Sequence, residues 1–308
     1  MIPRVSGSLA RSAGLESSSV TSVVSPVASP AFWGVEHDSA IMTTERSGEV
    51  FVHTLHEEKS DLISFGRSVE AAQHAGRLGV APRVVAADAD SDTVVFEALR
   101  TPWRTATMAD LSDPRLFTRV FAAQRALHRS APLTFSTSLF EEVERLRGVA
   151  VREGALLPAD IDFVVDAVRL AGEAVALMDR PAVPCHGDTI ASNVLFTDSD
   201  VRLCDFDRAG NADPLCDLAV LLSDAFMLED EWLAALEMLD QPADPVTLAL
   251  LHVYAAADDV AAALRAQVYA RRSRSRGLEY AKYGGWRFLK ARWLIQDRRF
   301  ELWLRNLS

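Results

Sequence analysis

The chain has 308 residues, of which 49% are hydrophobic and 24% are charged, a composition typical of a folded globular protein with one large or two moderate domains. Its net charge of −11 argues against a general nucleic-acid-binding protein, because neutralising phosphates requires a basic surface. Three cysteines without CxxC spacing, and no run of eighteen apolar residues, predict a cytoplasmic protein that lacks a disulfide framework, a structural zinc site and a membrane span.

The N-terminal third divides into two parts that differ in composition and hydrophobic pattern. Residues 1–30 are rich in Ser, Val, Ala and Pro and predict a mostly disordered extension, with a processed targeting segment as the alternative. Beyond it, apolar residues at helical spacing over 60–78 predict a helix that stops at Gly79. Strands are expected at 41–44, 50–55, 84–86 and 93–96, the first two joined by a Gly-containing hairpin loop at 45–49. Residues 31–98 therefore predict a small lobe with an antiparallel sheet and one helix.

The remaining residues, 99–308, follow a short linker around 97–104 and are mainly helical. Long Ala-, Leu- and Val-rich amphipathic stretches predict helices at 115–128, 161–177 and 246–269. One β-hairpin interrupts them, with strands at 193–196 and 201–204. The predicted fold class is α+β, with two lobes, and a ligand cleft is expected between them.

Three polar residues around this hairpin suggest phosphoryl transfer. Asp188 lies in the stretch Cys-His-Gly-Asp, Asn193 follows five positions later, and Asp205 comes twelve residues after Asn193. Phosphoryl transfer needs a carboxylate facing the acceptor hydroxyl and oxygen ligands on Mg²⁺, and the hairpin would bring Asp205 back beside Asn193. An amide oxygen and a carboxylate are both hard ligands suited to Mg²⁺.

The pattern His-Gly-Asp-x₄-Asn, then Asp-Phe-Asp, then Asp-Pro-Leu-Cys-Asp-Leu-Ala, resembles the aminoglycoside phosphotransferase/choline kinase family. The resemblance implies a two-lobed protein-kinase-like fold, with a nucleotide-binding N-lobe at 31–98 and a catalytic and substrate-binding C-lobe at 99–308. It implies that Asp188 is the catalytic base or orienting carboxylate and that His186 braces its loop. It also implies that Asn193 and Asp205 hold Mg²⁺ and that Asp217 supports the loop.

The small lobe departs from this pattern. Kinase-like enzymes usually place a Lys, or in this family an Arg, on the third strand, where this chain has His53. Glu70 is placed as the helix carboxylate, and beside it and the phosphates the pKa of His53 is expected to rise; the alternative is an exposed strand histidine without a ligand. There is no G-x-G-x-x-G loop before residue 41. Further nucleotide contacts are expected at Ser39, Glu97 and Leu99.

The acceptor should be bound by the helical lobe. Arg271, Arg272, Arg274 and Arg276 precede several aromatic residues and suggest either recognition of an anionic or sugar-like acceptor or a solvated face. The substrate candidates are Asp207, Asp258, Asp259, Tyr283 and Trp286, with Asp258 and Asp259 either contacting an amine or hydroxyl or merely facing water.

The leading hypothesis is Mg²⁺-dependent transfer of the γ-phosphate of ATP or GTP to a hydroxyl of a small molecule, such as an antibiotic, a sugar-like compound or an amino alcohol. The alternatives are a kinase-fold binding module without phosphotransfer and a repurposed transferase or lyase. A protein kinase is disfavoured because Asp207 occupies the usual Gly of the metal motif and no Ala-Pro-Glu segment follows. We expect a monomer or homodimer, with no nucleic-acid or membrane partner.

Overall fold

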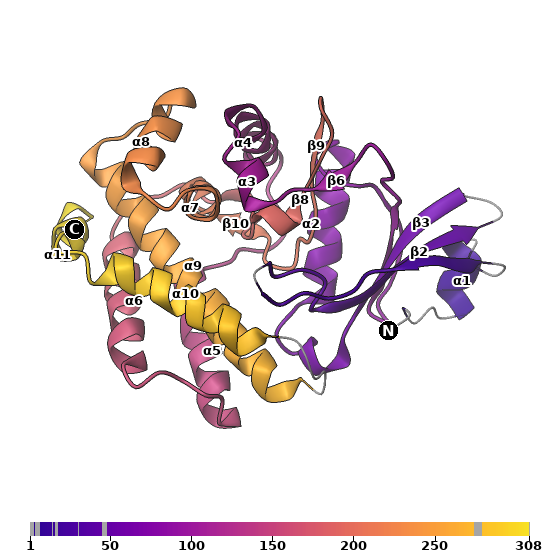
Figure 1. The fold of residues 1–308 in the computed structure, drawn as a ribbon, viewed down its shortest axis with the longest axis horizontal. Helices are drawn as coiled ribbons and strands as arrows, with labels where there is room; N and C mark the ends of the chain where they lie inside the picture. The colour runs from indigo at the N-terminus through magenta and orange to yellow at the C-terminus, as the bar shows by residue number, and fades with distance from the viewer. Residues whose placement is uncertain are drawn as a thin grey trace.

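A computed structural model describes residues 3, 7–13, 15, 18–29, 31–44, 48–273 and 279–307. A small lobe built on a β-sheet lies beside a larger helical lobe, with helix α2 (Phe65–Arg77) between the sheet and the helices (Figure 1). This arrangement confirms the predicted two-lobed α+β fold. The expected hairpin loop at 45–47, and Arg274 and Arg276, lie outside the described residues.

The small lobe is a five-stranded antiparallel sheet in the order β1-β2-β3-β5-β4. Alternation along its strands buries one face, where Val50, Val52 and Val95 pack together. The register places Ser39 opposite His53 on the neighbouring strand. The strands are β1 (Ser19–Val23), β2 (His37–Thr44), β3 (Gly48–Leu55), β4 (Val84–Asp88) and β5 (Thr93–Glu97).

The N-terminal segment differs from the predicted disordered extension over residues 1–30. Helix α1 (Gly7–Ala13) buries Leu9 and Ala13 in the core of the small lobe, and β1 pairs with β2 as an edge strand. Every residue of β1 is exposed, so the strand is held by backbone hydrogen bonds and not by an apolar face. Because such a strand needs no hydrophobic alternation, its sequence carries no strand signal.

Helices make up most of the large lobe, and three of them begin in the same way. In each of α4, α7 and α9, an Asp at the N-cap is followed by Pro at the first helical position, and the Asp carboxylate accepts hydrogen bonds from the first turn. The helices are α3 (Met108–Leu111), α4 (Pro114–His128), α5 (Leu139–Glu153), α6 (Ile161–Ala176), α7 (Pro214–Ala225), α8 (Glu229–Met238), α9 (Pro245–Arg272), α10 (Tyr280–Ile295) and α11 (Phe300–Asn306).

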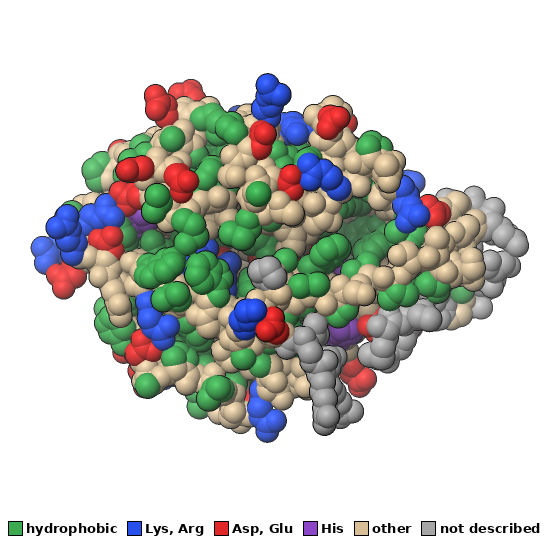
Figure 2. Space-filling model, in the orientation of Figure 1, with side chains coloured by type: hydrophobic (Ala, Val, Ile, Leu, Met, Phe, Trp, Pro, Cys, Tyr) green, Lys and Arg blue, Asp and Glu red, His purple; other side chains and the backbone are tan. Residues whose placement is uncertain are grey.

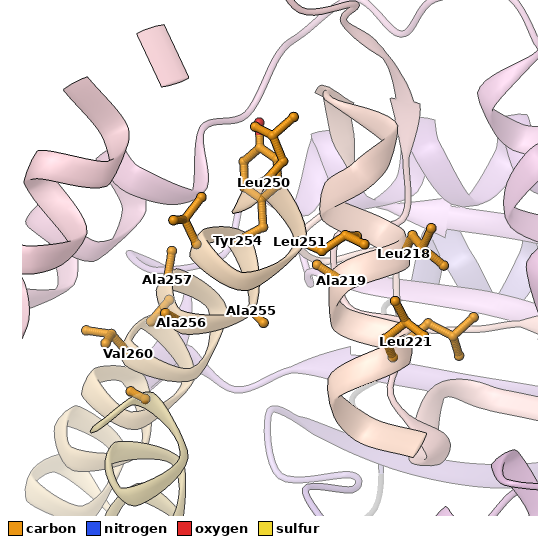
Figure 3. Packing of buried hydrophobic residues seen from close by; sticks show 14 of the residues in the cluster. Leu218, Ala219, Leu221, Leu250, Leu251, Tyr254, Ala255, Ala256, Ala257 and Val260 are labelled. Atoms are coloured by element: carbon orange, nitrogen blue, oxygen red, sulfur yellow. The ribbon is translucent and has the colours of Figure 1, made fainter. Parts of the chain in front are cut away.

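Helix α9 is the centre of the large lobe. Leu251 of α9 points toward α7 on the side that carries Ala219, and Leu250, Leu218 and Leu221 belong to the same continuous apolar core (Figure 3). Among the described helices, α9 alone is long and apolar enough to cross a membrane, and 78% of its apolar window is buried inside the protein. A helix that is apolar on all sides and covered by other helices is a core helix of a globular fold.

A buried ion cluster joins α9 to α10. Arg287 Nε lies 2.7 Å from Asp259 Oδ1, its Nη2 donates to Asp258, and Lys290 Nζ lies 3.7 Å from Asp259 Oδ1. Asp259 is fully buried, so its expected role as a substrate contact is not met by this geometry. The reason is that α10 packs its own cations against the two carboxylates, which sequence spacing along α9 cannot reveal.

Substitution of Arg287 by Ala should destabilise the protein by about 3–5 kcal/mol, because it leaves two buried carboxylates without their cation. Urea unfolding at pH 7, followed by circular dichroism, would measure the change. Arg305→Ala is the matched control, since Arg305 is exposed and pairs with Glu301 at 3.5 Å on the surface, and it should cost less than about 1 kcal/mol. Equal losses in the two variants would contradict a structural role for the cluster.

Candidate active site

Two short strand pairs hold the loop that carries Asp188. Strand β7 (Val183–Cys185), which precedes the loop, pairs with β10 (Gly210–Ala212), and β8 (Val194–Phe196), which follows it, pairs with β9 (Val201–Leu203). Beyond the second pair, Cys204 N donates to Asn193 O at 2.9 Å. The predicted hairpin is therefore present, and it returns the chain beside Asn193 at the start of the Asp-Phe-Asp segment.

The loop is fixed from behind by Asp217, which is fully buried on α7. Its carboxylate accepts hydrogen bonds from His186 N at 2.9 Å, Gly187 N at 2.7 Å and His128 Nε2 at 2.8 Å. Burial opposes ionisation, but the hydrogen bond from His128 and the nearby imidazoles outweigh it and lower the pKa of Asp217. An ionised Asp217 thus stabilises the loop in one conformation.

His186 ties the same loop to the end of the hairpin. Its Nδ1 accepts from Asp188 N at 3.2 Å, so Nε2 carries the proton and donates to Cys204 O at 3.0 Å. Burial lowers the pKa of His186, in keeping with this neutral tautomer. The contacts are those that a bracing residue needs; the bracing role itself stays a prediction.

Asp188 lies at the tip of the loop with two donors on its carboxylate. Asn193 Nδ2 donates to Asp188 Oδ2 at 3.0 Å and to Asp188 O at 2.9 Å. Arg208 Nη1 donates to the same Oδ2, and Arg208 Nη2 donates to Glu36 Oε1 at 2.9 Å. Both donors hold the Asp188 carboxylate in a single orientation, as phosphoryl transfer requires of an acceptor-facing group.

Three carboxylates meet beside Asp188. Oxygen atoms of Glu36, Asp205 and Asp207 lie within 4.8 Å of one another, and Asp205 takes a left-handed backbone conformation (φ 66°) that is costly for a non-glycine residue. Burial and then the charge of Asp207 raise the pKa of Asp205 well above its usual value, while burial and then the charge of Glu36 raise the pKa of Asp207 to about 7. Burial opposes ionisation of Glu36 as well, but the charges of Arg208 and Arg265 lower its pKa.

The residues at this cluster fit a hard divalent cation. Asp205 Oδ1 and Asp207 Oδ2 are buried and have no hydrogen-bond partner, so each offers a free lone pair. Carboxylate oxygens of this kind are the ligands that Mg²⁺ prefers. Asn193, the other predicted metal ligand, is brought beside this segment by the hairpin, although its Nδ2 faces Asp188.

Glu36 and Arg208 were not predicted from the sequence. Arg208 directly follows the Asp-Phe-Asp segment, and a basic residue beside clustered acids is a signal that could have been used. Glu36 carries no such signal, because it lies 172 positions from Arg208 in a segment without a recognised motif. Only the packing of the small lobe on the large lobe brings the two together.

On the nucleotide side, the expected rise in the pKa of His53 is wrong. The His53 ring is stacked 3.7 Å from the ring of His37, and its Nδ1 is 2.7 Å from Ser39 Oγ. Burial and then the neighbouring His37 hold the pKa of His53 well below its usual value. A neutral His53 supplies no phosphate-binding cation, although Ser39 and His53 do lie together on the sheet.

Glu70 also has a different partner from the one expected. Its carboxylate accepts from Thr134 N at 2.9 Å and from Thr134 Oγ1 at 2.7 Å on the exposed surface. The helix face that carries Glu70 is therefore turned toward the loop after α4 and away from β3. Glu97 accepts from Arg83 N at 2.8 Å at the end of β5, and Leu99 lies partly buried in the linker between the lobes.

The remaining substrate candidates are divided between the site and the surface. Tyr283 is buried with its ring stacked 4.6 Å from that of Phe32, whereas Trp286 is 39% exposed and packs edge-on against Trp293. Figure 2 shows hydrophobic side chains gathered over α10, where these tryptophans lie. Trp286 thus lies at the surface of α10 beside Trp293, whereas Tyr283 of the same helix is buried against the segment that carries Phe32.

A groove of about 1110 Å³ opens beside the catalytic loop. Its lining includes Gly187, Asp207 and Arg208 from the loop region and Asp258 and Arg265 from α9. Arg265 donates to Glu142 on α5 at 3.0 Å, so charges of both signs line the groove and neutralise one another in part. The groove is large enough for a small-molecule ligand.

A two-lobed fold in which an oriented loop aspartate adjoins an amide and clustered carboxylates defines the class of kinase-like phosphotransferases. The profile of the phosphotransferase enzyme family (APH) matches residues 30–251, most of the chain and all of the motifs above. The protein belongs to this family, as the sequence resemblance predicted.

Solved structures of small-molecule kinases share the fold. A choline/ethanolamine kinase family protein from Mesorhizobium loti superposes with a TM-score of 0.74 at 21% identity, covering 87% of this chain and 89% of its own. The choline kinase LicA from Streptococcus pneumoniae gives 0.72 at 17% identity, covering 90% and 94%. A spectinomycin phosphotransferase bound to ADP and spectinomycin gives 0.55 at 12% identity, covering 91% and 93%. No curated protein sequence matches the chain.

Gly187→Ala should disrupt the loop. Gly187 has φ +77°, and a Cβ there would stand 2.3 Å from Arg208 O, so the substitution adds a backbone clash to an unfavourable conformation. We expect a loss of about 3 kcal/mol in unfolding free energy, measured by urea titration. Gly154→Ala is the control, since Gly154 has φ +65° but open space around it, and should lose about 1 kcal/mol. If both variants lose a similar amount of unfolding free energy, the clash between a Cβ at position 187 and Arg208 O is absent.

The lowered pKa of Asp217 makes stability depend on pH. Its ionised form stabilises the fold above its unfolded pKa of about 3.9, and this contribution is lost as the pH falls through the lower folded value. Asp217→Asn should therefore cost about 2–3 kcal/mol at pH 7 and less at pH 3. Urea titrations at both pH values would test this against the exposed control Asp198→Asn. If Asp217→Asn lowers the free energy of unfolding by the same amount at both pH values, the charge of Asp217 is not the source of the stabilisation.

Proposed function

We propose that this protein transfers the γ-phosphate of ATP or GTP to a hydroxyl group of a small molecule in a Mg²⁺-dependent reaction in the cytoplasm. The observation that carries the proposal is the double anchoring of Asp188, by Asn193 and by Arg208, next to a cluster of carboxylates with free lone pairs. Membership of a phosphotransferase family and the kinase-like fold support the same reading.

In the proposed reaction, the acceptor hydroxyl lies against the Asp188 carboxylate, which orients it and takes its proton. The new bond joins the acceptor oxygen to the γ-phosphorus, and the bond from that phosphorus to the β,γ-bridging oxygen breaks, leaving the nucleoside diphosphate. Asn193 and Asp205 would hold Mg²⁺, which neutralises charge on the phosphates. Arg208, with a buried Nε that has no partner, keeps Asp188 in place.

The groove beside Gly187, Asp207 and Arg208 is the proposed acceptor site. Its volume suits a metabolite or antibiotic, and it joins the catalytic loop at Gly187. Because both charge signs line it, the groove selects for an acceptor by hydroxyl and amine hydrogen bonds together with shape, and not by one net charge. Nucleic acid is disfavoured as a partner by the net charge of −11.

Replacement of the three central residues tests the reaction. Asp188→Asn, Asn193→Ala and Asp205→Ala should each lower kcat by at least about 10²-fold, because each removes a group that acts on the transferring phosphoryl. The assay combines Mg·ATP or Mg·GTP with pooled hydroxylated metabolites and detects the phosphate mass increment in the product. Glu57→Gln, an exposed acid of the small lobe, is the control and should keep full activity. Turnover that survives Asp188→Asn would contradict the assignment.

A second candidate is a kinase-fold binding module without phosphotransfer, favoured by one observation: β3 carries no Lys or Arg among its residues, and burial lowers the pKa of His53, which takes the expected place of that cation. Calorimetry with Mg·ATP separates the two readings. Absence of nucleotide binding at millimolar concentration would support the binding module. Products without the phosphate mass increment would instead support a repurposed transferase or lyase.

A further inference from the structure

The segment that precedes β2 crosses from the small lobe to the catalytic lobe. The Phe32 ring lies 4.6 Å from that of Tyr283, and Phe32 O accepts from Ser192 Oγ at 3.1 Å. Four residues later, Glu36 Oε1 accepts from Tyr269 OH at 3.0 Å and from Arg208 Nη2 at 2.9 Å. A carboxylate of the segment between β1 and β2 is thus buried beside the Asp188 loop, where its hydrogen-bond donors Arg208 and Tyr269 belong to the large lobe.

Carboxylates crowd together beside Glu36. Arg208 is shared between Glu36 and Asp188, and Asp205 and Asp207 complete a set of four carboxylates around one guanidinium. His37 Nε2 lies 3.6 Å from Asp207 Oδ2, beyond hydrogen-bond distance. The charges of Arg208, Arg265 and Lys59 all act on Glu36, whereas Arg208 is the cation beside Asp205 and Asp207, where clustered buried carboxylates favour a bound cation or a proton.

The carboxylate oxygens of Glu36, Asp205 and Asp207 lie close enough together to bind one divalent cation. Ligand atoms from Glu36, Asp205 and Asp207 all lie within 4.8 Å of each other, and oxygens on an octahedral Mg²⁺ stand about 3–4 Å apart. Asp207 Oδ2 has no hydrogen-bond partner although its side chain is only 7% exposed, and Asp205 Oδ1 is also buried without one. Both oxygens belong to residues of the three-carboxylate cluster, and their burial distinguishes this cluster from an acidic patch on the surface.

We propose that a divalent cation binds between Glu36, Asp205 and Asp207 in the absence of nucleotide, and that it ties the segment before β2 to the catalytic lobe. This inference rests on the proposed function in one respect, since Asp205 is taken as a ligand of the catalytic metal. It adds that Glu36, from the small lobe, is a further ligand, so that the cation closes the segment over Asp188 before nucleotide arrives.

The test measures Mn²⁺ binding by calorimetry, without nucleotide, in the full-length chain. Mn²⁺ serves as the probe because it accepts the same oxygen ligands as Mg²⁺. Glu36→Gln and Asp207→Asn should each raise the Kd for Mn²⁺ at least about tenfold, since each removes one charged ligand. Glu57→Gln is the matched control, an exposed acid of the same lobe, and should bind like the wild type.

A double-mutant cycle decides whether Glu36 and Asp207 hold the same ion. Residues that share one ligand couple, so the Glu36→Gln/Asp207→Asn variant should lose less affinity than the two single losses combined. Hydrogen exchange of residues 31–44 gives a second readout: Mn²⁺ should slow exchange there in the wild type and not in Glu36→Gln. If Glu36→Gln fails to fold, the slowing of exchange in the wild type and its loss in Asp207→Asn still test the proposal.

The outcomes separate the two proposals. A Kd for Glu36→Gln within twofold of the wild-type value, or no Mn²⁺ binding by the wild type at millimolar concentration, would overturn the bridging cation. Phosphorylated product in the same preparations would leave the proposed function standing. Conversely, Asp188→Asn should bind Mn²⁺ normally, and turnover by that variant would overturn the proposed function while the cation result remained.

Discussion

The carboxylate of Asp217 is the contact on which the site depends. Asp217 is fully buried in the first turn of α7. Its carboxylate accepts hydrogen bonds from the successive backbone amides of His186 and Gly187, in the Asp188 loop, and from His128. Gly187 can satisfy this arrangement because it adopts a positive φ where any side chain would meet Arg208. The position of Asp188, and through it of Asn193 and Arg208, follows from that fixed backbone.

The electrostatics of the site are set by several carboxylates that lie close together and are largely buried from solvent. Burial and mutual repulsion raise the pKa values of Asp205 and Asp207, whereas Arg208 keeps Glu36 ionised. The small lobe contributes a carboxylate and two stacked neutral imidazoles to this region in place of a strand lysine. Arg208 and Arg265 of the large lobe and Lys59 of the small lobe compensate the charge of Glu36, which distinguishes this chain from the usual kinase-like arrangement that its family resemblance led us to expect.

Features that depend on neighbours in sequence were predicted well. The helices at 115–128 and 161–177, the hairpin after Asn193 and the strands of the small sheet follow from apolar periodicity and turn residues. The spacing from Asp188 to Asn193 to Asp205 identified the loop, because a short hairpin leaves few ways to connect them. The edge strand β1 was missed because its exposed side chains leave no periodic signal.

The amino-acid sequence by itself determined the family, the fold class and the hairpin that follows the Asp188 loop, since these are encoded in local spacing and turn chemistry. Only the tertiary structure decided which charges meet. Glu36 reaches Arg208 across 172 positions, Glu70 bonds to Thr134 and not to His53, and Asp259 is neutralised by Arg287 of α10. The physical reason is that an isolated polar residue can be satisfied by many partners, and the packing of lobes and helices selects one of them.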